Sequence, residues 1–370
     1  MSRAAATPHV RLLISIIALS ACNADRRPDP GANAISPTTV TVDTVPVLVL
    51  PSLGPNDSVN FGSTKFVARL ANGELAILDE SSRTIRVFGA AGESLREIGR
   101  RGEGPGEFQF PMWLGECRPD TLFAIDPATA RVSLFDSQGQ FVRQHPFKSR
   151  GSMMACDVTG QMLRLDLIGN TGMPTEQSPL YQGTVSLVGF DTPDRVLDTI
   201  PLYRNRPMGQ QGWIASANGT VYVGRGDSGF VESWRPGDST RTRHPLGTAG
   251  RIPTAAQYQA EIDRWLRMLS RPEDRVRPRE ILMRIPAPAT MPAFRAILAD
   301  PTGAVWAVTS PAGEPVTVLE GIDSLGRPLP PLRLPGDLDV QAVGRDHIVA
   351  IAEDADGAQR IIVFRLTRKE

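Results

Sequence analysis

The chain has 370 residues and carries 40 basic against 40 acidic side chains, so its formal net charge is zero. This balance argues against a nucleic-acid-binding protein, in which a basic excess or a basic stripe would be expected. The 34 glycines and 32 prolines exceed the usual share, which disfavours long helices and favours many short strands joined by turns. Three cysteines in so long a chain exclude a small disulfide-stapled fold.

The first residues have the pattern of a secretory signal. Two arginines and no acidic residue lie within residues 1–11, and residues 12–19 form a mostly aliphatic run. That run is too short for a transmembrane helix, which needs about 20 residues, but it suits the core of a signal peptide.

The end of this run resembles the lipobox of bacterial lipoproteins, because the residues Leu-Ser-Ala directly precede Cys22. The resemblance implies that residues 1–21 are removed and that Cys22 becomes the lipidated N-terminus. By the same resemblance, Asn23 favours the outer membrane, so the expected location is the cell envelope, facing the periplasm or the exterior. An ordinary secretory signal with an incidental cysteine is the alternative.

Residues 22–39 predict a flexible tether. They are polar and rich in proline, aspartate, asparagine and alanine, so they offer little apolar surface to bury. The folded domain is therefore expected to span residues 40–370.

The folded part of the chain repeats itself. Residues 72–92 and 119–139 align with an offset of 47 residues, and each contains two alternating strands separated by a polar turn with an aspartate. The pattern returns in weaker form at 159–166, 218–224, 302–308 and 345–353. Such alternation indicates half-buried antiparallel strands, and meanders that repeat every ~40–50 residues are typical of propeller blades. We therefore predict an all-β, six-bladed β-propeller with four-stranded blades; a β-sandwich with accidental internal similarity is the alternative.

Residues 87–111, which follow the NGELAILD of residues 72–79, resemble six-bladed β-propellers of the NHL-repeat-like group. These propellers are common as bacterial lipoproteins of uncharacterised function. The resemblance is strongest over residues 66–142. It implies a fold and a lipid-anchored setting but no activity, because members of the group vary widely in function.

The last unit is one strand short. Three strands can be recognised after Asp337 before the chain ends, whereas residues 40–50 are strand-like and belong to no unit. We expect residues 40–50 to supply the outer strand of the last blade. Such a closure removes a free sheet edge, which would otherwise invite aggregation.

Two insertions interrupt the repeat. Residues 170–182 are polar, and residues 250–285 contain a helical pattern that begins with a capping box at Thr254 and Gln257. The apolar face of this helix is formed by Tyr258, Ile262, Trp265, Leu266 and Leu269. The helix is expected between blades 4 and 5, either packed on the propeller or acting as a lid or partner-binding element. The charged segment 271–280 contains two prolines and is expected to be irregular.

Cys117 and Cys156 each lie three residues before a turn residue of adjacent units, Asp120 and Thr159. They are therefore expected near the same point of neighbouring inner strands. In an exported protein this position predicts a disulfide between blades 2 and 3. Two buried free thiols are the alternative.

No motif for catalysis or cofactor binding stands out. The GEGPG of residues 102–106 lacks the spacing and the following helix of a phosphate-binding loop, so we expect it to connect two blades. The four histidines include no H-x-x-x-H pair, and no G-x-S-x-G is present. Asp79 and Asp126 end equivalent strands and are expected to accept hydrogen bonds from turn amides. We therefore predict no cofactor, no metal site and no catalytic residue.

One face of the propeller is predicted to bind a ligand. Strand direction alternates within a blade, so the connections between second and third strands and those between blades emerge at the same end. Both insertions and residues 99–108 belong to this end. Large apolar side chains at the starts of inner strands either contact a ligand or plug the channel there: Phe66, Trp113, Met154, Trp213 and Phe294. A polar rim is expected from Arg100, Arg101, Glu103, Glu107, Arg204 and Arg206.

These features together predict a lipid-anchored, non-enzymatic binding or scaffold module outside the cytoplasm. The expected partner is a protein, a peptide or a glycan, with no nucleic acid and no membrane contact besides the anchor. One alternative is an enzyme at the channel mouth, of a propeller lactonase, lyase or dehydrogenase kind, which would need acids, bases or metal ligands facing one point. The other is a purely structural envelope subunit.

Overall fold

The computed structural model describes residues 39–50, 64–147, 153–157, 159–168, 174–175, 177–189, 193–209, 211–267, 272–353 and 358–369. The chain divides into two units, Met1–Pro37 and Thr38–Glu370, and every described residue belongs to the second. The predicted signal peptide, the lipidation site Cys22 and, apart from Thr39, the tether lie outside the described residues. Within the described ranges, no helix is long and apolar enough to cross a membrane.

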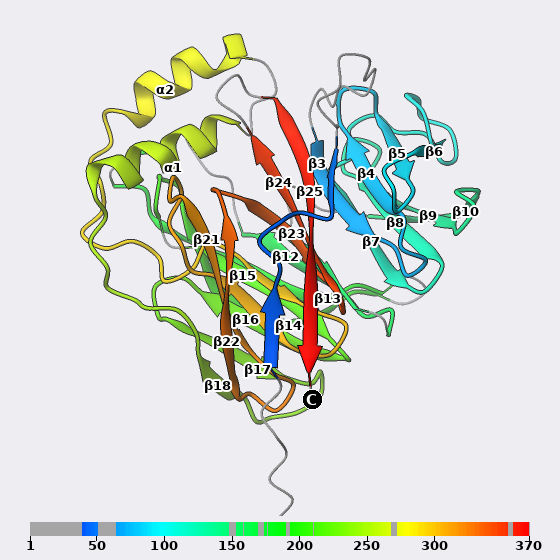
Figure 1. Ribbon diagram of the computed structural model, residues 1–370. Helices are drawn as coiled ribbons and strands as arrows, with labels where there is room; N and C mark the ends of the chain where they lie inside the picture. Colours follow the sequence, from blue (N-terminus) through cyan, green and yellow to red (C-terminus); the bar gives the residue numbers. More distant parts are fainter. Residues whose placement is uncertain are drawn as a thin grey trace, which may run out of the picture. The chain divides into compact units, whose positions relative to one another are not determined.

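The second unit is a six-bladed β-propeller, as predicted (Figure 1). Blade 1 contains β3 (Thr64–Arg69), β4 (Leu75–Asp79), β5 (Thr84–Phe88) and β6 (Ser94–Ile98), and blade 2 contains β7 (Trp113–Arg118), β8 (Thr121–Asp126), β9 (Arg131–Asp136) and β10 (Phe141–Pro146). Blade 3 contains β11 (Met153–Cys156), β12 (Met162–Leu167), β13 (Leu180–Leu187) and β14 (Arg195–Arg204), and blade 4 contains β15 (Gly212–Ala217), β16 (Thr220–Arg225), β17 (Phe230–Trp234) and β18 (Thr242–Pro245). Blade 5 contains β19 (Ile297–Ala299), β20 (Val305–Val308), β21 (Val316–Ile322) and β22 (Pro328–Pro335). Blade 6 contains β23 (Asp339–Val343), β24 (His347–Glu353) and β25 (Gln359–Lys369), completed by β1 (Thr39–Val42) and β2 (Leu48–Leu50).

The hydrophobic core consists of layers between neighbouring blades. All five residues of β4 are buried, whereas β6, the outer strand of the same blade, is mostly exposed. Leu78 of β4 shares a buried cluster with Leu114 of β7 and Ala124 of β8. The central strands are thus buried on both faces between neighbouring blades, so the expectation that they are half-buried is wrong for β4.

Closure of the ring follows the prediction for residues 40–50. β1 and β2 both pair with β25, antiparallel, from Thr39↔Lys369 to Leu50↔Ile361. The strand is interrupted between Val42 and Leu48, where Pro46 offers no backbone N–H to the ladder. Val40 and Leu50 are both buried, so the N-terminal strands add to the core as well as covering the edge.

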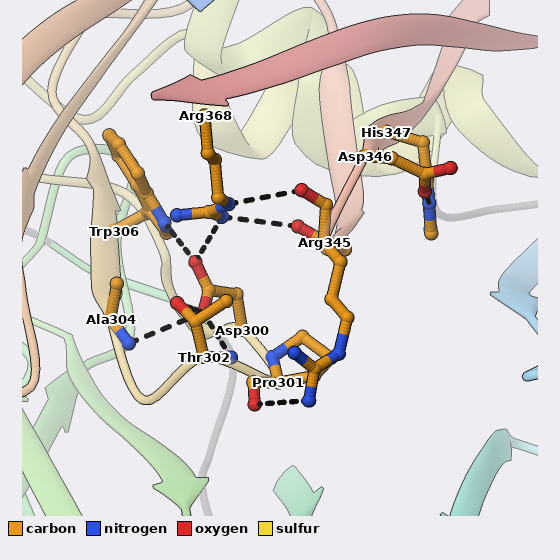
Figure 2. Close-up of polar contacts among 10 residues, drawn as sticks. Asp300, Pro301, Thr302, Ala304, Trp306, Arg345, Asp346, His347 and Arg368 are labelled. Atoms are coloured by element: carbon orange, nitrogen blue, oxygen red, sulfur yellow. Dashed lines mark hydrogen bonds and ion pairs between the residues drawn. The ribbon is translucent and has the colours of Figure 1, made fainter. Parts of the chain in front are cut away.

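The C-terminal strand is also tied to blade 5 by a buried ion pair (Figure 2). The Arg368 Nη2 of β25 lies 2.6 Å from Oδ2 of Asp300, and the Asp300 side chain is fully buried. Asp300 also accepts hydrogen bonds from Nε1 of Trp306 at 2.9 Å and from the backbone amide of Thr302 at 2.8 Å. This cluster therefore links the closing blade to its neighbour through one carboxylate.

The insertion between blades 4 and 5 forms α1 (Ala255–Arg267), a 3-10 turn η1 (Pro272–Arg275) and α2 (Val276–Leu282). The capping box is present, because the Gln257 amide donates to Oγ1 of Thr254 at 3.2 Å and the Thr254 amide donates to Oε1 of Gln257 at 3.0 Å. The expectation of an irregular segment after α1 is wrong. Its two prolines fall in the first turns of η1 and α2, where a missing N–H costs no helical hydrogen bond.

The apolar face of α1 packs as expected, with Ile262 and Leu266 buried in one cluster with Leu282 and Ile285; Leu269 lies outside the described residues. The other insertion is shorter than predicted, because residues 180–182 already belong to β13. Of the remaining residues, 170–173 and 176 fall outside the described ranges.

Candidate functional site

A recess lies on the face where the connections between second and third strands and those between blades emerge. Its lining includes Met208, Gly209 and Gln211, which precede β15, and Glu261 and Arg264 of α1. Arg251, Met291, Pro292, Phe294 and Arg295 flank the helical insertion and line the base. Residues 309–312, between β20 and β21, complete it. We use the term recess for this set of residues.

Arg251 holds the base of the recess together. Its Nη2 donates to the carbonyl oxygen of Thr309 at 2.8 Å and to that of Ala293 at 3.3 Å. The backbone adds a bond from the Met291 amide to the Arg251 carbonyl at 2.8 Å. Burial lowers the pKa of Arg251, and the carboxylates of Glu320 and Glu314 oppose that effect. Arg251 therefore links the segment before β19, which contains Ala293, to the segment after β20, which contains Thr309.

Arg295 is fixed from blade 6. Its Nη2 donates to Oδ1 of Asp337 at 2.9 Å and to the Leu338 carbonyl at 3.1 Å. The second oxygen of Asp337 accepts the Gly313 amide at 2.8 Å. Burial and then the positive charge of Arg264 lower the pKa of Arg295, so the two guanidinium groups lie close enough to repel each other.

Arg264 projects from α1 toward the same group. Its Nη1 lies 3.5 Å from Oε2 of Glu261, whose other oxygen accepts Nε1 of Trp265 at 3.0 Å. Burial disfavours the charge of Arg264, but the carboxylates of Glu261, Asp339 and Asp337 outweigh burial and raise its pKa. Arg264 therefore remains positively charged. It lies close to Arg295, which makes shorter hydrogen bonds than Arg264 does.

Helix α1 is docked on blade 5 rather than standing apart from it. Gln257 Nε2 donates to Oε1 of Glu314 at 2.6 Å, and a Cβ added at Gly313 would lie only 2.5 Å from Cβ of Ala260. The hydroxyl of Tyr258 donates to the Ile285 carbonyl at 2.7 Å. These contacts position Glu261 and Arg264 over the recess.

The structure places the predicted apolar residues in different surroundings. Phe294 lines the recess, and Trp213 packs beside it in the layer between blades 4 and 5. The indole N–H of Trp213 is buried without a hydrogen-bond partner among the described residues. Phe66, Trp113 and Met154 pack into the layers between blades 1, 2 and 3, so they stabilise blade contacts.

The predicted polar rim is divided as well. Arg206 precedes Met208 of the recess in the chain, and its Nη2 donates to the Pro286 carbonyl at 2.5 Å. The side chain of Arg204 lies outside the described residues.

The remaining predicted rim residues, Arg100, Arg101, Glu103 and Glu107, belong to the connection between blades 1 and 2. An ion pair within this loop joins two of them. Arg100 Nε lies 2.7 Å from Oε1 of Glu107. The Gly104 amide, and then Arg100, lower the pKa of Glu107. Arg131 of β9 donates to the Glu103 carbonyl at 2.7 Å, which holds this loop, including Arg101, against blade 2. The GEGPG segment is thus a blade connection, as expected.

The cysteines lie where the repeat predicted them. The structure joins Cys117 of β7 to Cys156 of β11 in a disulfide, with a Cα–Cα distance of 5.2 Å. The bond links the inner strands of blades 2 and 3, and Cys117 is fully buried. Its role is therefore to hold two blades together.

The other polar groups that the sequence singled out have structural partners among the described residues. Asp126 accepts the amides of Ala128 and Gln109, and Asp79 accepts that of Ser81, as expected of turn residues. His347 Nδ1 lies 2.7 Å from Oδ1 of Asp346 (Figure 2), and burial lowers the pKa of His347. In the described part of the chain, no group of three or more His, Cys, Asp or Glu is placed to hold a metal ion.

No protein-family model and no curated protein matches the chain. Among solved structures, a member of the DUF4221 family from Bacteroides vulgatus is similar with a TM-score of 0.54 and 11% identity, over 90% of this chain and 99% of that one. A Bacteroides fragilis protein named as a candidate exported protein has a TM-score of 0.49 and 13% identity, over 90% and 96%. A gluconolactonase from Xanthomonas campestris has a TM-score of 0.45 and 12% identity, over 83% and 88%. Likeness at these identities shows the propeller fold alone.

Proposed function

We propose that this protein is a non-enzymatic binding module of the cell envelope, anchored through a lipid on Cys22 and capturing an extracytoplasmic partner at the recess. The single observation that supports binding is the position of the recess. It forms on the face where both insertions emerge, and its walls come from blades 3, 4 and 5 together with α1. Concave sites with mostly apolar walls and a few placed polar groups are the usual form of a ligand site.

The attachment of the tether is consistent with this role. Thr39 pairs with Lys369 at the end of β25, which is the end of the propeller opposite α1 (Figure 1). The first described strand therefore begins on the face that does not carry the recess. Its start does not occupy the face at which we propose that a protein, peptide or glycan binds.

A pair of photo-crosslinking variants tests the proposal. One carries the photoreactive residue at Ile252, next to Arg251 of the recess, and the other carries it at Leu325, in a turn on the opposite face. The two side chains are 79% and 68% exposed, so the variants are matched in accessibility. Both are expressed as the full chain in the native envelope, irradiated and purified.

A crosslinked partner from position 252 and none from position 325 is the expected result. Adducts from position 325 alone would show that the binding face is wrongly assigned. A partner turned over to product by the purified protein would show that the module is an enzyme.

A further inference from the structure

The positive side chains of the recess differ in how far their hydrogen-bonding capacity is used. Nη2 of Arg251 is held by loop carbonyls, and Nη2 of Arg295 is held by Asp337 and the Leu338 carbonyl. The Arg264 guanidinium has only one partner among the described residues, Glu261, at 3.5 Å. A formed, charge-assisted bond between such groups measures about 2.7–2.9 Å. Most of the donor capacity of Arg264 is therefore unused.

The acidic groups around Arg264 are already bound by other donors. Glu261 accepts the indole N–H of Trp265, and Asp337 accepts both Arg295 and the Gly313 amide. Asp339 accepts Nε2 of Gln341 at 3.0 Å. The negative charge of these carboxylates favours the charged form of Arg264. Their oxygens nevertheless leave most N–H groups of its guanidinium without an acceptor.

Arg264 lies among charges of both signs, since nearby carboxylates raise its pKa while its own charge repels that of Arg295. Arg264 and Arg295 lie close enough for the charge of one to lower the pKa of the other. An anion placed against Arg264 would offset that repulsion as well as accept its N–H groups. Gln211 also lines the recess; its side-chain amide makes no hydrogen bond to any described residue and can add a further donor.

Besides its charged groups, Gln211, Thr309 and Ser310, the recess is lined by apolar residues. Met208, Met291, Phe294 and Ala312 line the recess and are buried. Thioether and aromatic groups of this kind accept an aliphatic or aromatic body of variable shape.

We propose that the recess binds a carboxylate attached to an apolar group, with Arg264 as the principal donor and the methionines and Phe294 around the apolar part. This inference rests on the proposed function, because it names the class of ligand for the same recess. Ligands of this class include free organic acids and the C-terminal residue of a peptide, which share the same chemistry.

The test uses the full chain in detergent and two probes of matched shape, 3-phenylpropionate and its neutral amide, 3-phenylpropionamide. Calorimetry gives the affinity of each. We expect the acid to bind at least about tenfold more tightly than the amide, as the loss of one charge-assisted hydrogen bond implies. In Arg264→Gln the acid should lose about tenfold in affinity and the amide should be unchanged.

Two further variants keep the test independent of folding defects. Gln211→Glu adds a negative charge to the wall without removing a protein contact, and it should weaken the acid selectively. Arg243→Gln removes a positive charge from the outer strand β18, where this side chain is 67% exposed, and it should change neither affinity. Melting curves of all variants report whether the fold is intact.

Equal affinity for acid and amide, an acid affinity unaffected by Arg264→Gln and Gln211→Glu, or no binding of the acid to the wild-type protein would each overturn this assignment. Failure here with a partner still crosslinked at position 252 means that only the ligand class is wrong. Loss of the crosslink at that position refutes the binding face itself.

Discussion

Replacement of Asp300 by asparagine should destabilise the propeller more than its position in a turn suggests. The fully buried carboxylate receives Arg368 from blade 6 and the indole of Trp306 on the same oxygen, Oδ2. Asn keeps one acceptor oxygen, so its NH2 group faces either both of these donors or the amides of Thr302 and Ala304, which the other oxygen accepts. Arg368, whose side chain is 15% exposed, loses its counter-charge in either case. Breaking a buried ion pair by removing one partner costs about 3–5 kcal/mol, and we expect a loss in this range.

A matched control exists in the same blade. Asp323 also accepts turn amides, from Leu325 at 2.9 Å and Arg327 at 2.8 Å, and it pairs with the Arg327 side chain. That side chain is 42% exposed, so water can replace the lost contact, and Asp323→Asn should cost at most about 1 kcal/mol. Urea titrations followed by tryptophan fluorescence give both values. If Asp300→Asn costs no more than Asp323→Asn, the link between blades 5 and 6 does not stabilise the fold as argued.

Three further predictions concern the ends of the chain and the disulfide. Replacing Cys117 and Cys156 together by alanine should lower the free energy of unfolding by about 4 kcal/mol in the chain-entropy model, because the two cysteines are 39 residues apart. Denaturant titration measures this loss. Two alkylatable thiols in the unreduced exported protein would contradict the bond. Deleting residues 39–50 removes two buried side chains and exposes β25. We therefore expect the free energy of unfolding to fall by about 3–6 kcal/mol and the solubility to decrease. An unchanged melting curve would refute closure by these strands. Cys22→Ser should release the protein from membranes, and a variant that still fractionates with the membranes would disprove lipidation.

Much of the fold could be predicted because its signals are local. Short apolar segments bounded by turn residues, such as those of β4 and β8, indicate strands. Glycines such as Gly92 and Gly139 mark the turns at which the backbone takes φ values of 89° and 81°. Because each blade repeats this pattern, counting the units also counted the blades. The missing strand of the last unit and the strand-like residues 40–50 then indicated closure.

The candidate site could be predicted only in part. Topology placed the insertions on one face, and Phe294 and Arg206 were recognised from their positions at strand starts and in a connection. Arg251, Arg264 and Arg295 were missed, because in the sequence each is one arginine among many. The helical spacing of apolar residues in α1 also identifies the polar face of this helix. A search for basic residues on that face would have found Arg264.

The sequence by itself determined the repeat, the number of blades, the closing strand and the spacing of the two cysteines, because strand periodicity and turn chemistry act over a few neighbouring residues. Only the tertiary structure decided that Met208, Gly209 and Gln211 meet Arg251, Arg264 and residues 309–312. It also decided that residues 100–107 fold back on blade 2. Long connections converge through contacts between distant parts of the chain, and those contacts leave no periodic trace in the sequence.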